Sequence, residues 1–140
     1  MGTLHTVAAV ILNPQGEVLL VRKRASAIFI QPGGKTEPGE EPLSALAREL
    51  DEELGVQLDH ASAVWLGEFE ADAVNEPGLR VRAHAYRCAV HGTPAPQAEI
   101  EALAWVDPAG PYPVTVAPLS AEHILPALLA WQGKGGSALR

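Results

Sequence analysis

Apolar side chains recur at every third or fourth position across residues 41–54, and this is the clearest helical pattern in the chain. Such spacing lines up one apolar stripe that a helix can bury against a core. Pro42 suits a first turn, where an amide hydrogen would have no partner within the helix, and Gly55 is an expected stop. The pattern predicts an amphipathic helix whose stripe consists of Leu43, Leu46, Ala47, Leu50 and Leu54.

Apolar runs predict the strands that precede this helix. Residues 6–12 are a continuous apolar run rich in β-branched side chains, which is typical of a strand buried on both faces. A turn sequence, Asn-Pro-Gln-Gly at residues 13–16, leads into a second strand at residues 17–24, so we expect a hairpin. Residues 28–31 predict a short strand that runs into Pro32, Gly33 and Gly34. The two glycines permit backbone conformations closed to other residues and let a ligand approach the main chain.

Alternating patterns follow the helix. Residues 63–71 predict a strand with Trp65 and Phe69 on one face, and residues 79–90 alternate most regularly. Neither face of the segment 79–90 is cleanly apolar, so we expect one side of it to line a polar cleft. A short strand is expected at residues 104–106, between loops at residues 92–98 and 109–119.

The C-terminal region predicts a last helix and then a tail. Ser120 is a good N-cap for a helix over residues 121–131, in which Pro126 predicts a kink or a tightened turn. Residues 133–140 are rich in glycine and are expected to fray. We therefore expect one domain over residues 1–132, followed by a flexible tail at residues 133–140.

Composition and charge narrow the class of protein. The chain has 140 residues, 47% of them hydrophobic and 19% charged, which is typical of one globular domain. It contains no apolar run long enough for a membrane span. Its one cysteine, Cys88, cannot form an internal disulfide, so a cytoplasmic setting is expected. A net charge of −7 argues against nucleic-acid binding and means that an anionic substrate would require recruited cations.

Carboxylates are concentrated in the predicted helix. Glu49, Glu52 and Glu53 fall at positions i, i+3 and i+4, so their side chains converge on one patch beside the apolar stripe. Such a patch repels itself, and the repulsion grows near a core of low dielectric constant. Arg48, paired with Glu52 four residues on, offsets part of the repulsion, and divalent cations would offset more. Asp51 points to another side of the helix and is expected to face solvent.

Nine residues in this region stand at spacings that resemble the Nudix box. They are Gly34, Glu40, Arg48, Glu49, Leu50, Glu52, Glu53, Gly55 and Val56. Every position of that pattern is filled, which makes the match specific. The order of elements around the box, a strand hairpin before it and a helix at the end, is also similar to the Nudix domain, so the resemblance covers nearly the whole chain.

The resemblance implies a fold and a reaction. The fold would be an α/β architecture in which a mixed β-sheet lies between helices. The reaction would be the hydrolysis of the pyrophosphate bond in a nucleoside diphosphate linked to another moiety, such as a nucleoside triphosphate or a nucleotide sugar. The cofactor would be Mg²⁺, with Mn²⁺ as the alternative cation, because these ions prefer oxygen ligands and can activate water. The partner would be this nucleotide-type small molecule, bound by a monomer or a homodimer.

Roles for the acidic residues follow from the resemblance. Glu52 and Glu53 would bind metal, and the carbonyl group of Gly33 would complete the site. Glu49 would bind a second metal or act as the general base. Glu99, six residues before Trp105, stands where a glutamate of MutT-like members supplies a further ligand or the base.

The remaining roles concern positioning and substrate contact. Arg48 would hold Glu49 or Glu52 by an ion pair, and Glu40 would orient the loop or the ligands. Gly34 and Gly55 would be structural. Arg22 matches a position that touches the nucleotide in MutT-like members. The basic cluster at residues 22–24 has another interpretation, a solvated strand end whose charges blunt the edge of a sheet.

Substrate identity is less clear from the sequence. The markers of family members that cleave ADP-ribose or dinucleoside polyphosphates are missing from residues 71–74. Gln31 stands where MutT itself has an aromatic residue, so an oxidised-guanine substrate is not supported. Trp65, Trp105 and Trp131 could stack on a base, but each is expected to belong to the core. The histidines have no ligand-like spacing, and none is assigned to a metal.

The sequence also bears on two other classes of function. A nucleotide-sensing domain without catalysis would keep the fold, but such domains usually lose carboxylates from the box, and this chain has all of them. A diphosphate isomerase would need a cysteine that protonates carbon. Cys88 lies outside the box and is expected to be a small buried side chain rather than a reactive thiol.

Overall fold

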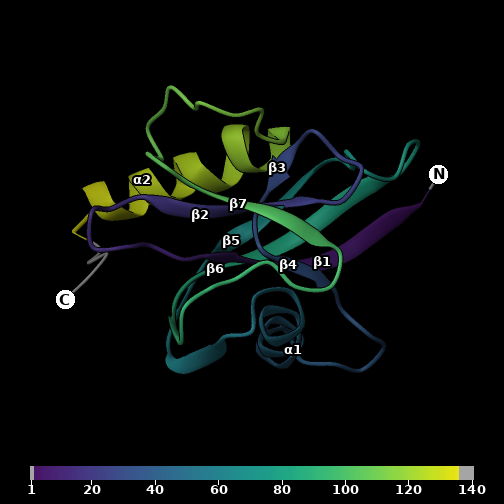
Figure 1. The fold of residues 1–140 in the computed structure, drawn as a ribbon, viewed down its shortest axis with the longest axis horizontal. Coiled ribbons are helices and arrows are strands. Elements are labelled where there is room, and N and C mark those ends of the chain that lie inside the picture. Colours follow the sequence, from purple (N-terminus) through teal and green to yellow (C-terminus); the bar gives the residue numbers. More distant parts are fainter. Residues whose placement is uncertain (1, 136–140) are drawn as a thin grey trace.

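Figure 1 shows the computed structural model, which describes residues 2–135. The elements are β1 (Thr3–Val10), β2 (Val18–Lys23), β3 (Phe29–Ile30), β4 (Gly33–Lys35), α1 (Pro42–Leu54), β5 (Gln57–Asp72), β6 (Arg80–His91), β7 (Ile100–Val106), the π-helical segment η1 (Leu119–Ile124) and α2 (Leu125–Gly133). The helix predicted over residues 41–54 is confirmed. Of the expected tail at residues 133–140, Gly133 ends α2, and residues 136–140 lie outside the described residues.

The strands form two sheets between the helices. One sheet has the order β4-β1-β6-β5, and the other has the order β3-β2-β7. β1 runs parallel to β6, whereas β1 with β4, β5 with β6, and both pairs of the smaller sheet are antiparallel. In Figure 1, α1 lies on one side of the strands and α2 on the other. The predicted α/β fold, with mixed strands between helices, is confirmed.

The helices pack against the strands through two apolar cores. The first contains Leu46, Leu50 and Leu54 of α1, and the second contains Leu125 and Leu128 of α2. β1 contributes to both cores, because alternate side chains of its apolar run point to opposite faces. The prediction that this strand is buried on both faces is therefore confirmed.

The expected hairpin between β1 and β2 is wrong beyond its first residues. The turn forms, with the amide of Gly16 donating to the carbonyl of Asn13 at 2.9 Å, and the amide of Leu19 donates to the carbonyl of Ile11 at 3.0 Å. The two strands then separate into different sheets. Each apolar strand is paired along its length by a strand from later in the sequence, β6 for β1 and β7 for β2, and local patterns do not reveal such partners.

β5 and β7 are longer than their apolar patterns predict. β5 begins at Gln57 rather than at residue 63, and β7 begins at Ile100 rather than at residue 104. Their additional residues include polar side chains, and pairing with β6 and β2 extends the ladders through them. Backbone pairing, rather than side-chain pattern, sets these boundaries.

A bulge in β5 overturns the expected placement of Trp65. Trp65 pairs with Tyr86 and Gly67 with Ala85, so two steps on β5 match one step on β6. This extra residue puts Trp65 and Phe69 on opposite faces. Gly67, within the irregularity, has a positive φ of 147°. Trp65 is 58% exposed rather than buried in a core. The other two tryptophans are partly buried, each against a core, as expected.

The last helix also differs from its prediction. Ser120 is not an N-cap, because it lies buried inside η1, and its amide donates to the carbonyl of Ala117 at 3.0 Å. Pro126 lies in the first turn of α2, where the π-helical segment changes to α-helix. A proline lacks the amide hydrogen that would continue the earlier hydrogen-bond register, so a change of register is tolerated there. No helix within residues 2–135 is long and apolar enough to cross a membrane.

We predict that Leu50→Ala lowers the free energy of unfolding by about 2 to 5 kcal/mol, because Leu50 is fully buried in the first core. Leu129→Ala is the matched control, since Leu129 is 38% exposed on α2 and should cost less than about 1 kcal/mol. Denaturant unfolding of both variants measures the difference. Equal costs for the two variants would contradict this assignment of the core.

Candidate active site

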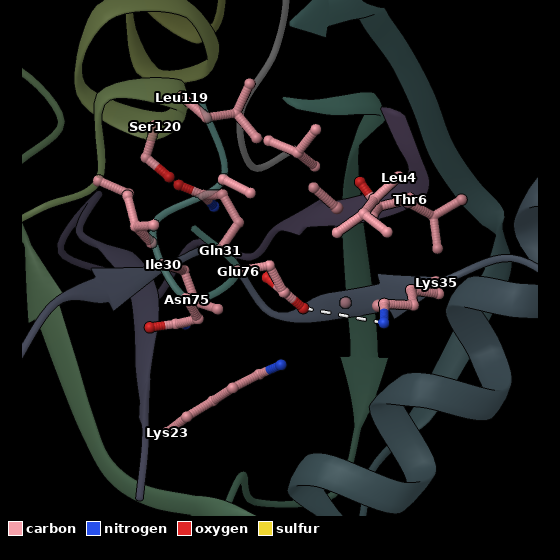
Figure 2. A pocket seen from close by; sticks show the side chains of 18 of the residues that line it. Leu4, Thr6, Lys23, Ile30, Gln31, Lys35, Asn75, Glu76, Leu119 and Ser120 are labelled. Atoms are coloured by element: carbon pink, nitrogen blue, oxygen red, sulfur yellow. Dashed lines mark ion pairs between the residues drawn. The ribbon is translucent and has the colours of Figure 1, made fainter. Parts of the chain in front are cut away.

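A pocket of about 350 Å³ lies where the two sheets diverge, and Figure 2 shows its lining. Its walls come from strands β1, β2, β3, β4 and β6, from α1, from the loop after β5, and from the segments that precede β7 and α2. The predicted site residues that line it are Gly33, Gly34, Glu49, Glu53 and Glu99. The tertiary structure thus brings together residues from three separate parts of the chain.

The two glycines allow β4 to approach β1 and α1 closely. Gly33 has a φ of 144°, and a side chain on it would overlap the carbonyl group of Val7. A side chain on Gly34 would overlap the carboxylate of Glu49. The missing Cβ atom of Gly34 therefore lets β4 approach the acidic face of α1, and that of Gly33 lets β4 lie close against β1.

Arg48 is the hub of an ion-pair network beside the pocket. Its guanidinium group donates to both carboxylate oxygens of Glu40, at 2.9 and 2.8 Å, and to the carbonyl of Lys35 at 3.1 Å. Arg48 Nη1 also donates to Glu49 Oε2 at 2.8 Å. The expected pair with Glu52 is longer, at 3.4 Å. These contacts tie the loop before α1 to the helix. The orienting roles of Glu40 and Arg48 stay predictions.

The network changes the acidity of Glu40. Hydrogen bonds from Arg48, and then from the amide of Glu37, lower the pKa of Glu40 to about 2. The same contact with Glu40 raises the pKa of Arg48. Glu40 and Arg48 are therefore both charged near neutral pH, and the ion pair between them is retained there.

The carboxyl groups of Glu53 and Glu49 are shielded from solvent. Glu53 is only 4% exposed, and the amide of Gly33 donates to its Oε1 at 3.3 Å. Burial raises the pKa of Glu53 to about 7, against the opposing hydrogen bond from Gly33 and with a further contribution from the charge of Glu49. Burial likewise raises the pKa of Glu49, and its contact with Arg48 opposes this shift. The ionised pair is thus unfavourable unless a cation compensates it.

Lys23 is the cation that faces this pair from β2. Its ammonium group lies 3.3 Å from Glu99 Oε1, and its charge lowers the pKa of both Glu49 and Glu53. Arg22 of the same basic cluster was the residue expected at the substrate, and no sequence signal pointed to Lys23. Adjacent strand residues face opposite sides, and the pairing register shifts between these two residues, so the sequence alone did not distinguish them.

Arg22 is held away from the pocket. Its Nη1 donates to Glu101 Oε1 at 2.7 Å and to the carbonyl of Ser26 at 2.9 Å, and the guanidinium group lies 5.8 Å from the centre of the Phe29 ring. The pocket lining does not include Arg22. Its predicted contact with the substrate stays a prediction, and this arrangement would have to open for the contact to form.

The remaining box residues lie at the edge of the site. Glu52 is 54% exposed at its side chain, and Asp51 faces solvent as predicted. Gly55 ends α1 in the left-handed conformation, with a φ of 68°. Cys88 is buried, and burial raises the pKa of its thiol to about 12, which gives no support to an isomerase based on this residue.

The donor set fits a hard divalent cation in its chemistry. Within residues 2–135, no three carboxylate, histidine or cysteine side chains already converge as a ligand cluster. Glu49, Glu53 and Glu99 nevertheless line one pocket, all three offer oxygen, and the charges of Glu49 and Glu99 each raise the pKa of Glu53. Carboxylate oxygens that repel one another in a desolvated pocket suit Mg²⁺ or Mn²⁺.

The chain is similar to known proteins in both sequence and fold. A family model described as the NUDIX domain matches residues 3–128. The CTP pyrophosphohydrolase of Escherichia coli strain K12 is 33% identical over 132 residues, which span 89% of this chain and 93% of that protein. The solution structure of the E. coli ORF135 protein has a TM-score of 0.76 at 29% identity, with 96% of this chain and 94% of that chain covered.

A second curated relative matches a shorter segment. The 8-oxo-dGTP diphosphatase of E. coli strain K12 is 36% identical over 74 residues. That match covers 50% of this chain and 57% of the relative. The likeness to this enzyme therefore concerns only part of each protein.

We predict that Glu53→Gln stabilises the metal-free protein above pH 7. The pKa of Glu53 is higher in the folded than in the unfolded state, so its contribution to stability is full below about pH 4.5 and is lost as the pH rises through about 7. The wild-type protein should lose on the order of 1 to 3 kcal/mol over this range relative to the variant.

Denaturant unfolding of both proteins in the presence of a chelator, at intervals from pH 5 to pH 8, measures this difference. Glu52→Gln is the control, because Glu52 is exposed on the same helix. Parallel stability curves for the wild type and Glu53→Gln would contradict the prediction.

Proposed function

This chain belongs to the Nudix hydrolase family, and we propose that it hydrolyses nucleoside triphosphates to nucleoside monophosphates and pyrophosphate with the help of a divalent cation. The resemblance seen in the sequence is confirmed by the family match over residues 3–128. The chain is therefore an enzyme that acts on nucleotide derivatives. The proposal of a triphosphate substrate is supported by two relatives, whose names state that they act on CTP and on 8-oxo-dGTP.

The buried pair of Glu49 and Glu53 is the observation that carries this proposal. Two carboxylates whose pKa values are raised by burial lie in one pocket beside the glycine backbone of β4. Burying such charges is costly, and a protein that needed only stability would gain from apolar side chains there. Perturbed carboxylates in a pocket are typical of sites where charge is used in chemistry.

The acidic residues would bind the cation and accept a proton from the attacking water. Glu52, Glu53, Glu99 and the carbonyl of Gly33 are the proposed ligands. A bound Mg²⁺ ion would offset phosphate charge and make water more acidic. Glu49 is the proposed general base, because Arg48 binds its Oε2 and leaves Oε1 free to accept a proton. Water oxygen would then bond to phosphorus while a bridging P–O bond breaks and the pyrophosphate leaves.

The basic residues would position the acidic residues and the phosphates. Arg48 is a positioning residue, since it braces Glu40 against Glu49. Lys23 lines the pocket and would pair with substrate phosphate oxygens once cations occupy its carboxylate neighbours. We also propose that the protein acts in the cytoplasm, as a monomer or a homodimer.

We predict that Glu53→Gln lowers kcat at least about 100-fold while the fold is retained, because the substitution removes a charged ligand and leaves the shape unchanged. Pyrophosphate release from a panel of nucleoside triphosphates with Mg²⁺ or Mn²⁺ measures the loss. Asp51→Asn is the matched control on the same helix, since Asp51 faces solvent, and it should keep near wild-type activity.

A rate for Glu53→Gln close to that of the wild type would overturn the assignment of this residue. A wild-type protein that binds nucleotides tightly, yet releases no phosphate or pyrophosphate from any member of the panel, would instead indicate a sensing domain.

A further inference from the structure

The ladder between β2 and β7 is irregular where it reaches the pocket. Arg22 pairs with Ala102, but Lys23 pairs with Ile100, so Glu101 is an extra residue on β7. Such a bulge moves the residues beyond it to the opposite face of the strand. Ile100 accordingly lies in the first core, whereas Ala102 packs against the second, although regular alternation would put both on one face. The bulge therefore sets the face on which β7 begins.

The turn immediately before β7 contains a backbone conformation that alanine rarely adopts. The amide of Ile100 donates to the carbonyl of Gln97 at 3.0 Å, which closes the turn over Ala98 and Glu99. Ala98 has a φ of 53°, in the left-handed region that favours glycine. Strain of this kind persists only where the surrounding contacts hold it, and it is concentrated at functional sites.

Main-chain contacts on both sides hold this turn. The amide of Gln97 donates to the carbonyl of Glu53 at 2.9 Å, which ties the turn to the end of α1. The amide of Arg24 donates to the carbonyl of Glu99 at 2.8 Å, and its guanidinium group donates to the carbonyl of Ala98 at 3.3 Å. The turn is thus fixed between the end of α1 and the end of β2.

Glu99 is a central residue of this turn, so the turn decides where its side chain projects. Its Oε1 lies 3.3 Å from the ammonium group of Lys23, and it lines the pocket together with Glu49 and Glu53. The side chain of Glu99 is 62% exposed, so packing contributes little to its direction. The main chain has to aim this carboxylate at the pocket.

We propose that Ala98 is a positioning residue, whose left-handed conformation directs Glu99 toward the cation site. The inference rests on the proposed function, because it concerns a proposed ligand of the same site. A negative φ at Ala98 would change the direction of the peptide group that leads into Glu99 and give a turn of another type. The strain at this one alanine is therefore assigned to the placement of one carboxylate.

Ala98→Gly and Ala25→Gly test the strain itself. Ala25 is the one other non-glycine residue within residues 2–135 that has a positive φ, 67°, and it is exposed in a turn that carries no carboxylate. Glycine adopts a positive φ freely, so both substitutions should move the denaturant midpoint of unfolding upward. A lower midpoint for Ala98→Gly would contradict the proposal.

Ala98→Pro tests the positioning. Proline locks φ near −65°, so the turn cannot keep its left-handed residue. The dissociation constant of Mn²⁺, measured by calorimetry with the full chain and no nucleotide, should rise about 10-fold, the order seen when groups that orient metal ligands are changed. If the proline variant does not fold, Ala98→Val replaces it, because a β-branched residue disfavours a positive φ, and a rise of at least about 3-fold is expected.

Glu99→Gln separates positioning from a general structural role. This substitution should itself weaken Mn²⁺ binding about 10-fold. The change at Ala98 should then add less than about 2-fold, because it acts only through Glu99. A merely structural role predicts equal weakening with and without the Glu99 carboxylate. That result, an unchanged affinity in either single variant, or no Mn²⁺ binding by the wild type, would overturn the proposal.

Pyrophosphate release from nucleoside triphosphates separates this inference from the proposed function. Turnover by the wild type, together with additive effects of the two substitutions on Mn²⁺ binding, would leave the function standing and remove the role of Ala98. Coupled effects on Mn²⁺ binding, with no hydrolysis of any triphosphate, would support the role of Ala98 and remove the proposed function.

Discussion

The desolvated carboxylates of Glu49 and Glu53 are the constraint on which the site depends. Burial raises the pKa of both residues, and their mutual repulsion adds to the cost. The fold has to provide compensation nearby, and it does so with the amide of Gly33, the guanidinium group of Arg48 and the ammonium group of Lys23. This arrangement leaves negative charge that a divalent cation can neutralise, which is the physical basis of the proposed chemistry.

Helix α1 meets two demands with one periodic pattern. Its leucine stripe fills the first core and holds the helix against the sheet. The neighbouring positions then carry the carboxylates to the glycine backbone of β4, where no Cβ atom intervenes. Because the same packing that stabilises the fold also positions Glu49 and Glu53, a shift of the helix would disturb stability and site together. Arg48 joins the preceding loop to the helix and limits that shift.

The pocket lining combines charged and apolar side chains. Glu49, Glu53, Glu99 and Lys23 are charged, whereas Ile30, Val81 and Leu119 contribute apolar surface. Gln31 stands where MutT itself has an aromatic residue, and its Oε1 atom is buried without a hydrogen-bond donor among the described residues.

The sequence by itself determined α1, the stripe, the acidic patch and the family, because each depends on spacings within one helix or one short motif. It also indicated that Gly33 and Gly34 allow a close approach to the main chain, whereas the contact of Gly34 with Glu49 came from the tertiary structure. Tertiary structure alone decided which strands pair, so the expected hairpin opened into two sheets and a bulge turned Trp65 to solvent. It also placed Lys23 rather than Arg22 in the pocket and left Gln31 Oε1 unpaired. Those outcomes depend on contacts between residues far apart in the chain, and no local pattern encodes them.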